Sequence, residues 1–246
     1  MENKPKNYLN DEHLSIGTRE YLRVLNAGGR PVESLPVAEA RKVLADVQAA
    51  VEVDLSGIDE REREIVADGH ALTLHLVRPH GSRGRLPYFV FIHGGGWVLG
   101  DYSTHRRLVR DLVVESEVAA VFVDYTPSPE AKYPQAVDEI YAAVKWVAEN
   151  DAELDLDRRR MALVGNSAGG NMALAAALLA KKRHAPAVRA LVLLWPVTSA
   201  SSDWKSYALY GGERFLTAPL MKWMFDRYTT DARAREEILL SPVNAS

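Results

Sequence analysis

The feature that most constrains the fold is the segment Gly165-Asn166-Ser167-Ala168-Gly169. It lies between an apolar run, Met161 to Val164, and an alanine-rich run that reaches Ala180. This order predicts a buried strand, a tight turn and a helix. Glycine two residues before and after Ser167 suits such a turn, because a larger side chain would collide with the crossing backbone. We therefore expect Ser167 at the tip of a strand-to-helix turn.

A serine in this position suits acyl transfer. The first amide groups of a helix have no partner within the helix, and the helix dipole favours negative charge beside them. A Gly-x-Ser-x-Gly pattern also arises by chance in a chain with 16 glycines, but the apolar strand and the alanine-rich helix around it are what the mechanism needs. The sequence therefore predicts Ser167 as a catalytic nucleophile.

A second glycine-rich segment, His93-Gly94-Gly95-Gly96-Trp97, directly follows the apolar run Pro87 to Ile92. Three consecutive glycines predict a backbone that bends sharply and closely approaches another group. We expect the amides of Gly94, Gly95 and Ala168 to form an oxyanion hole, in which each donor contributes about 3 kcal/mol to transition-state stabilisation. A phosphate-binding loop is disfavoured, because neither a Lys-Ser/Thr pair nor Gly-x-Gly-x-x-Gly spacing is present.

Strands and helices alternate along the middle of the chain. After a helical pattern at 104–117, strand and helix patterns follow one another at 118–125, 134–149, 158–166, 167–183 and 188–196. This order predicts an α/β fold, a mostly parallel sheet flanked by helices, with an antiparallel hairpin of residues 62–68 and 71–78 at one edge. Ligands bind at the carboxyl ends of parallel strands, where both glycine motifs fall. The hairpin histidines, His70, His75 and His80, are expected to face solvent.

Two flanking segments are expected to form a helical cap. Residues 1–55 hold two amphipathic helical patterns, and residues 197–246 hold a helical pattern that begins near Thr217. We therefore divide the chain into an N-terminal cap segment (1–55), a core (56–196) and a cap or lid segment (197–246). The aromatic residues at 97, 223, 225 and 228 are expected to wall a small apolar site, with Trp97 and Asn166 as substrate-binding residues. Ordinary packing of the last helix fits the pattern equally well.

Composition disfavours several classes of function. The 246 residues carry a net charge of −3 and include no cysteine, so a basic field for nucleic acid or anionic membranes, disulfides and thiolate metal sites are not expected. We expect no metal and no cofactor. The longest apolar runs are too short to span a bilayer, and no signal-peptide pattern follows Met1, so a cytoplasmic location is expected.

Taken together, the motifs resemble a known family. The segments are His93-Gly94-Gly95-Gly96-Trp97, Asp124-Tyr125 with Pro129-Glu130, and Gly165-Asn166-Ser167-Ala168-Gly169-Gly170. They resemble α/β-hydrolase carboxylesterases of the bacterial family similar to hormone-sensitive lipase. The resemblance implies an α/β-hydrolase fold and hydrolysis of small, short-acyl esters through an acyl-enzyme on Ser167, beneath a cap built from both flanking segments. Asn166 departs from the family, which usually carries an acidic residue there.

The last third of the chain departs further from the resemblance. The family order is nucleophile, acid, histidine. The residues after Ser167 contain one histidine, His184, which a continuous helix would hold about 25 Å from the turn at 1.5 Å per residue. We therefore expect C-terminal polypeptide, on the same or another chain, to supply an Asp or Glu and a His and to cover the apolar strand at 190–195. A homo-oligomer is compatible with this expectation.

Two other functions stay open. A catalytically incomplete ligand-binding module of the same fold, like the plant gibberellin receptors, would hold a small ligand without turnover. An intact acid and histidine in further polypeptide would favour the esterase, and their substitution would favour the binding module. A Ser-x-x-Lys enzyme built on Ser202 and Lys205 is disfavoured, because no Lys-Thr-Gly or Ser-Asp-Asn accompanies it.

Overall fold

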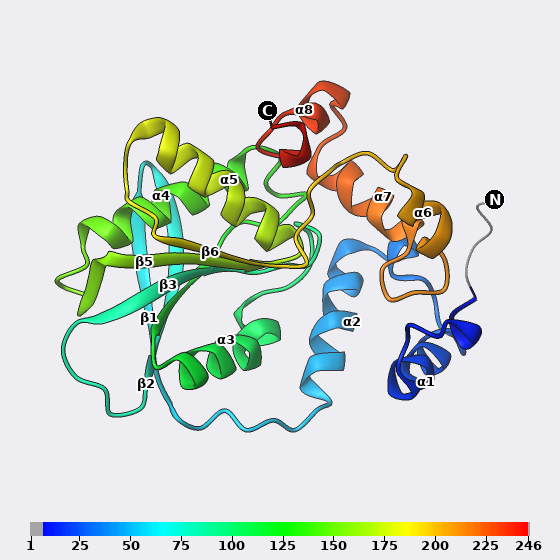
Figure 1. Cartoon of the computed structure of the whole chain (residues 1–246), viewed down its shortest axis with the longest axis horizontal. Coiled ribbons are helices and arrows are strands. Elements are labelled where there is room, and N and C mark those ends of the chain that lie inside the picture. Colours follow the sequence, from blue (N-terminus) through cyan, green and yellow to red (C-terminus); the bar gives the residue numbers. More distant parts are fainter. Residues whose placement is uncertain (1–6, 246) are drawn as a thin grey trace.

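A computed structural model describes residues 7–245, so Met1 to Lys6 and Ser246, at the outer ends of the two cap segments, lie outside the described residues. Across the described residues the sheet has the strand order β1-β2-β4-β3-β5-β6 (Figure 1). The strands are β1 (Ile58–Ala67), β2 (His70–Pro79), β3 (Leu86–Ile92), β4 (Ala119–Asp124), β5 (Leu156–Asn166) and β6 (Ala190–Leu194). Strands β4, β3, β5 and β6 run parallel, whereas β2 pairs antiparallel with both β1 and β4. The α/β fold, with a parallel majority and an antiparallel hairpin at one edge, is confirmed.

Helices cover both faces of the sheet (Figure 1). Helix α3 (Tyr102–Ser116) lies on one face, and α4 (Gln135–Glu149) and α5 (Ala168–Arg183) lie on the other. The remaining helices are α1 (Ile16–Leu25), α2 (Val37–Ala49), α6 (Lys205–Tyr210), α7 (Ala218–Tyr228) and α8 (Ala232–Glu236). Because side chains alternate along a strand, Val90 and Ile92 pack into the core shared with α4 and α5, whereas Phe89 and Phe91 pack toward α3. Both faces of the central strands are therefore buried, which explains their continuous apolar runs.

The outer face of the hairpin is also covered. The ring of His75 stacks on that of Tyr102 at 4.0 Å, and its Nε2 lies 3.1 Å from a carboxylate oxygen of Asp124. The prediction of solvent exposure is wrong for His75, whose side chain is 13% exposed, because the start of α3 lies over this strand. It holds for His80, which is 75% exposed.

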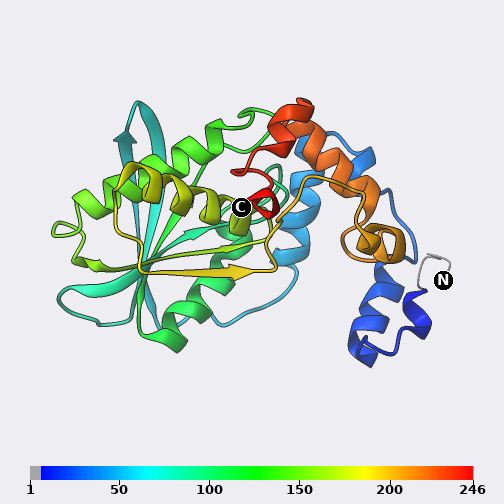
Figure 2. The same cartoon turned by 45° about the horizontal axis from the view of Figure 1, so that its top comes forward.

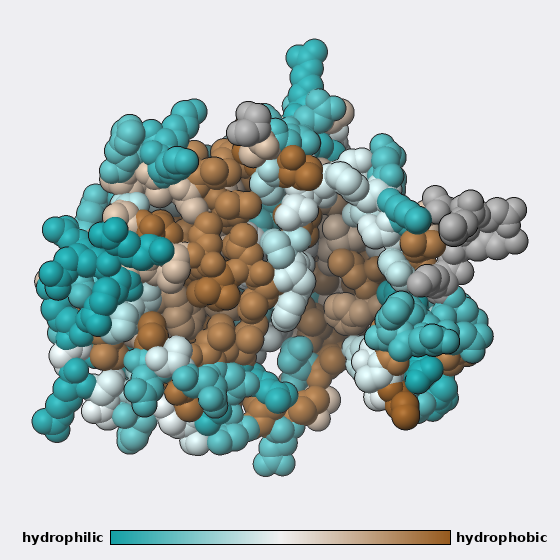
Figure 3. All heavy atoms as spheres, viewed as in Figure 1, coloured by the Kyte–Doolittle hydropathy of each residue, from teal (hydrophilic) through white to brown (hydrophobic). Residues whose placement is uncertain are grey.

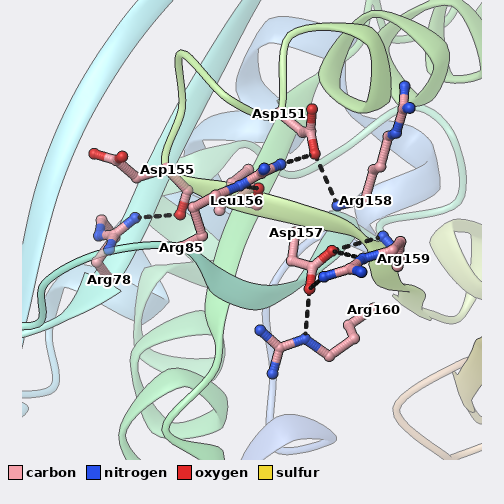
Figure 4. Close-up of polar contacts among 9 residues, drawn as sticks. All are labelled: Arg78, Arg85, Asp151, Asp155, Leu156, Asp157, Arg158, Arg159 and Arg160. Carbon is pink, nitrogen blue, oxygen red and sulfur yellow. Dashed lines mark hydrogen bonds and ion pairs between the residues drawn. The ribbon is translucent and has the colours of Figure 1, made fainter.

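Charged side chains fix the amino end of β5, at the opposite end of the strand from the serine motif (Figure 4). The carboxylate of Asp157 accepts hydrogen bonds from Arg159 and Arg160. Arg85 pairs with Asp151 and donates to the carbonyl oxygen of Leu156 at 2.8 Å. The contacts of Arg85 join the start of β3 to the start of β5, whereas those of Asp157 lie within β5 itself.

The flanking helices gather beyond the carboxyl ends of the parallel strands (Figures 1 and 2). Arg41 of α2 ties the N-terminal segment to the core, because its guanidinium donates to the carbonyl oxygens of Val98 at 2.8 Å and Ser128 at 2.9 Å and pairs with Glu130. The helix predicted from Thr217 is present as α7, with the Thr217 side chain accepting from the Leu220 amide. The division into cap and core segments stays a prediction.

Strand β6 forms one edge of the sheet and, within residues 7–245, pairs with β5 alone. Its apolar side chains are partly uncovered: Leu191 is 38% and Val192 is 43% exposed, and Trp195, just after the strand, is 69% exposed. Figure 3 shows apolar side chains gathered over β6 and the neighbouring part of α5. An apolar sheet edge of this kind is a surface on which further polypeptide can pair.

Candidate active site

Ser167 occupies a sharp turn between β5 and α5. Its backbone has φ 54° and ψ −122°, a conformation that non-glycine residues rarely adopt and that is typical of functional positions. Its amide donates to the carbonyl oxygen of Leu194 at 2.9 Å, and its carbonyl oxygen accepts from the amides of Asn171 and Val197. A side-chain carbon on Gly169 would lie 2.1 Å from the carbonyl oxygen of Ile92, so only glycine allows this turn to sit against β3. The turn predicted from the sequence is present.

Residues 93–97, the glycine loop, follow β3 and lie beside this turn. Gly95 has φ +112°, which glycine adopts readily, and its carbonyl oxygen accepts from the amides of Val98 and Leu99. The loop therefore folds back on itself immediately after the strand. This conformation leaves the amides of Gly95 and Gly96 without an acceptor anywhere in residues 7–245, and the same holds for the amide of Ala168 at the first position of α5.

The first glycine of the loop differs from its neighbours. The amide of Gly94 donates to Oδ1 of Asn166 at 3.0 Å, so it is not free to bind an oxyanion in this conformation. The expectation that Gly94 is an oxyanion donor is therefore corrected, because a side chain satisfies its amide. The free donors at the site are the amides of Gly95, Gly96 and Ala168.

The side chains of both residues expected to bind substrate are engaged within the protein, Trp97 by packing and Asn166 by hydrogen bonds. The indole of Trp97 is fully buried, and its ring stacks on that of Tyr228 at 4.7 Å and packs on Phe225 at 5.0 Å. Asn166 is half-buried, with its side-chain amide engaged by Gly94 and by His105. The aromatic residues thus form the packed underside of α7, and contact of Trp97 or Asn166 with substrate stays a prediction.

Two neighbouring histidines, His93 at the start of the glycine loop and His105 of α3, are held neutral. His93 is buried between the rings of Phe122 and Tyr125, at centroid distances of 5.4 and 4.2 Å. Desolvation, together with the nearby His105, lowers the pKa of His93 to about 4. Burial also lowers the pKa of His105, against the opposing effect of the carbonyl oxygen and the charge of Asp101. Both imidazoles are therefore uncharged near neutral pH.

This burial makes stability depend on pH. The unfolded chain protonates His93 near its usual pKa of 6.5, whereas the folded protein resists protonation until about 4. Burial of neutral His93 therefore costs no stability above pH 6.5. As the pH falls from 6.5 toward 4, the free energy of unfolding decreases, by up to about 2 kcal/mol between pH 6.5 and pH 5. Urea unfolding at a series of pH values should show this decrease in the free energy of unfolding, and the decrease should be smaller in His93→Gln.

The control for this prediction is His13→Gln, which removes an exposed imidazole far from the buried site and should leave the pH dependence of the unfolding free energy unchanged. An equal pH dependence in His93→Gln and in the unmodified protein would contradict the assignment of a buried neutral His93.

No acid–base pair reaches Ser167 from the described residues that follow it. His184 ends α5, a helix of 16 residues that begins beside Ser167. Asp226 is paired with Lys222 and Arg235, and Asp231 caps α8. Among residues 7–245, no group of three His, Asp or Glu residues is arranged to hold a metal ion, and no helix is long and apolar enough to cross a membrane.

Comparison with known proteins decides the family. A family model described as the α/β hydrolase fold matches residues 89–246. This chain belongs to that α/β-hydrolase family. Its fold is shared with the crystal structure of a thermostable esterase from Pseudomonas putida, to which it is 51% identical with a TM-score of 0.94, over 96% of this chain and 75% of that chain.

Family members with assigned activities are also similar in sequence. An ethyl acetate hydrolase from Pseudomonas putida is 31% identical over 92% of this chain and 74% of its own length. The carboxylesterase NlhH of Mycobacterium tuberculosis is 38% identical over 59% of this chain and 46% of its own length. The chain spans 62% of an α/β hydrolase of Acanthamoeba polyphaga mimivirus, to which it is 32% identical. The activities of these longer relatives are therefore a basis for proposals.

Proposed function

We propose that this protein hydrolyses carboxylic esters of small molecules through an acyl-enzyme formed on Ser167. The observation that carries the proposal is the strained turn at Ser167 beside the unpaired amides of Gly95, Gly96 and Ala168. A nucleophile next to several aligned donors is the arrangement that acyl transfer requires. Relatives that are named esterases and an ethyl acetate hydrolase support the same chemistry.

The proposed reaction proceeds in two halves. The hydroxyl oxygen of Ser167 attacks the ester carbonyl carbon, its proton passes to a general base, and the carbonyl oxygen becomes an oxyanion that accepts from the free amides. The bond to the alcohol then breaks, and the base returns the proton to the leaving oxygen. Water repeats these steps on the acyl-enzyme, releasing the carboxylic acid and the free serine. Each amide donor lowers the barrier by about 3 kcal/mol.

We propose that the general base and its acidic partner come from polypeptide outside these 246 residues, on the same or a second chain. The support is twofold: Asp226 of α7 and Asp231, the N-cap residue of α8, are engaged in other contacts, and β6 has an uncovered apolar edge. A serine hydroxyl without a base is a weak nucleophile. An ester assay and intact-mass measurement on a protein of this exact length should give no turnover, and an active monomer of 27 kDa would contradict the proposal.

A catalytically incomplete binding module is the second candidate, favoured by the same lack of a base near Ser167. It would bind esters or acids of similar size without hydrolysing them. Calorimetric titration of the whole protein with a short-chain ester distinguishes the two, since saturable binding with no release of acid supports the module, whereas release of acid supports the enzyme.

We also propose that the substrates have short acyl chains, because the aromatic side chains beneath α7 are packed against one another and leave little room for a long chain. Trp97 then limits the length of the acyl chain indirectly, because its ring packs against α7 and holds that helix in place. Acetyl to hexanoyl aryl esters should give the highest kcat/KM. A profile that keeps rising beyond about ten acyl carbons, the size that a site of several hundred Å³ accommodates, would contradict it.

A further inference from the structure

We propose that Asn166 is a positioning residue for the glycine loop: its side-chain amide, oriented by the imidazole of His105, holds the amide of Gly94 and thereby the loop that presents the free amides of Gly95 and Gly96. The inference rests on the proposed function, because it assigns a role within the same site. It concerns a residue at which this chain departs from the acidic side chain that the sequence resemblance would imply.

The contact joins the two motifs of the site. Oδ1 of Asn166 accepts from the Gly94 amide at 3.0 Å, across 72 positions of sequence. A side-chain carbon on Gly94 would lie 2.6 Å from the Asn166 carbonyl oxygen and 3.1 Å from Cβ of Ser167, so the glycine loop and the serine turn are in direct contact. Because Asn166 is bonded to Ser167, its side chain links the nucleophile to the loop that carries the oxyanion donors.

The orientation of the Asn166 amide follows from its partners. The Gly94 amide can only donate, so it requires the oxygen of Asn166 and not the nitrogen. Nδ2 of Asn166 then lies 3.4 Å from Nε2 of His105, where it donates a long hydrogen bond. His105 must therefore present a lone pair at Nε2, which is the neutral imidazole.

The contacts of Nδ1, on the other side of the His105 ring, favour the same neutral tautomer. Its Nδ1 lies 3.2 Å from the carbonyl oxygen of Asp101 and 3.0 Å from the hydroxyl of Thr104. A carbonyl oxygen only accepts, so Nδ1 carries the proton and Nε2 is left as the acceptor. The chain of contacts from Asp101 through His105 and Asn166 to Gly94 is thus consistent at every step.

A proton on Nε2 of His105 would break this series of hydrogen bonds. It would face the amide protons of Asn166, and relief by rotation of that amide would turn a donor toward the Gly94 amide. The ionisable groups around His105 are His93, the first residue of the glycine loop, and Asp101, at the start of α3, with Asp124 acting on His93. Burial disfavours the charged imidazole of His105. It therefore keeps Nε2 as the acceptor on which the position of the glycine loop depends.

The first test measures the contacts directly, without ester hydrolysis. In ¹⁵N spectra of the whole protein at pH 7, His105 should carry its proton on Nδ1, and the Gly94 amide should be protected from hydrogen exchange. Asn166→Ala should accelerate exchange of Gly94 by about tenfold, the effect expected from loss of one hydrogen bond. Asn171→Ala is the matched control, because Asn171 lies on α5 and donates to Val197 and Leu240 without touching the loop.

Asn166→Asp keeps an acceptor for the Gly94 amide and provides a second measurement if the alanine variant fails to fold. Its other carboxylate oxygen faces Nε2 of His105, so His105 should become protonated on both nitrogens at pH 7, with the Gly94 amide still protected. A proton on Nε2 in the unmodified protein, unchanged Gly94 exchange in Asn166→Ala, or a neutral His105 in Asn166→Asp would each overturn the proposal.

The second test uses the proposed activity. In the whole protein, Asn166→Ala should lower kcat for a short-chain ester by at least about tenfold with little change in KM, because it displaces donors that act on the transition state. Lack of hydrolysis by the unmodified protein would refute the proposed function but not the loop contacts seen in the spectra. Normal kcat in a folded Asn166→Ala protein would refute the positioning role alone.

Discussion

Replacement of Ser167 by alanine is expected to reduce the hydrolysis of a short-chain aryl ester by at least about 10⁴-fold in the whole protein. Ser167 combines the strained turn, the amino end of α5 and the neighbouring glycine loop. Removing the nucleophile of a serine hydrolase abolishes the acyl-enzyme route and leaves only the smaller effect of the oxyanion donors. The measurement is the initial rate at saturating ester, with circular dichroism to verify folding.

Ser202→Ala is the control for this experiment. Ser202 is exposed and belongs to the Ser-x-x-Lys segment that ends at Lys205. Its replacement should leave the rate unchanged. A rate that falls with Ser202→Ala and persists with Ser167→Ala would reverse the assignment of the nucleophile.

The second large effect is expected at the glycine loop. A side-chain carbon on Gly95 would lie 2.0 Å from the carbonyl oxygen of Leu99, and the φ of +112° is unsuited to a branched side chain. Gly95→Val must therefore displace the backbone that carries two free amides. We expect kcat to fall by at least about a hundredfold, the effect of losing one oxyanion donor.

Gly29→Val separates this effect from backbone strain in general. Gly29 has a similar φ of +107°, but nothing lies within 4 Å of the side chain that would be added. Both variants should lose some stability in urea unfolding, whereas only Gly95→Val should lose kcat. Near-normal kcat in a folded Gly95→Val protein would mean that the glycine loop has another role.

The order of strands and helices could be predicted from the sequence because β3 and β4 are apolar along most of their length and β5 carries the apolar run Met161 to Val164. Runs such as Pro87 to Ile92 are buried on both faces, as is typical of a strand inside a parallel sheet. The turn at Ser167 was predictable for a related reason, since the flanking glycines allow the backbone to cross β3 closely. Helices α6 and α8, of six and five residues, could not be found, because they are too short to display a helical period.

The site was less predictable, because it depends on contacts between distant segments. The engagement of the Gly94 amide requires the register between β3 and β5, which brings Asn166 beside the loop. Likewise, the burial of Trp97 requires α7 to pack over the loop, with Tyr228 stacked on the indole ring. Residue types at a motif indicate the chemistry, but which amides stay free is decided by tertiary packing.

The most direct test of the central claim is covalent labelling of the whole protein with a fluorophosphonate, followed by peptide mapping by mass spectrometry. We expect one adduct per chain, on Ser167, and its yield should fall in parallel with ester hydrolysis during the labelling. An adduct on a different residue, or full hydrolysis after Ser167 has been modified, would contradict the account.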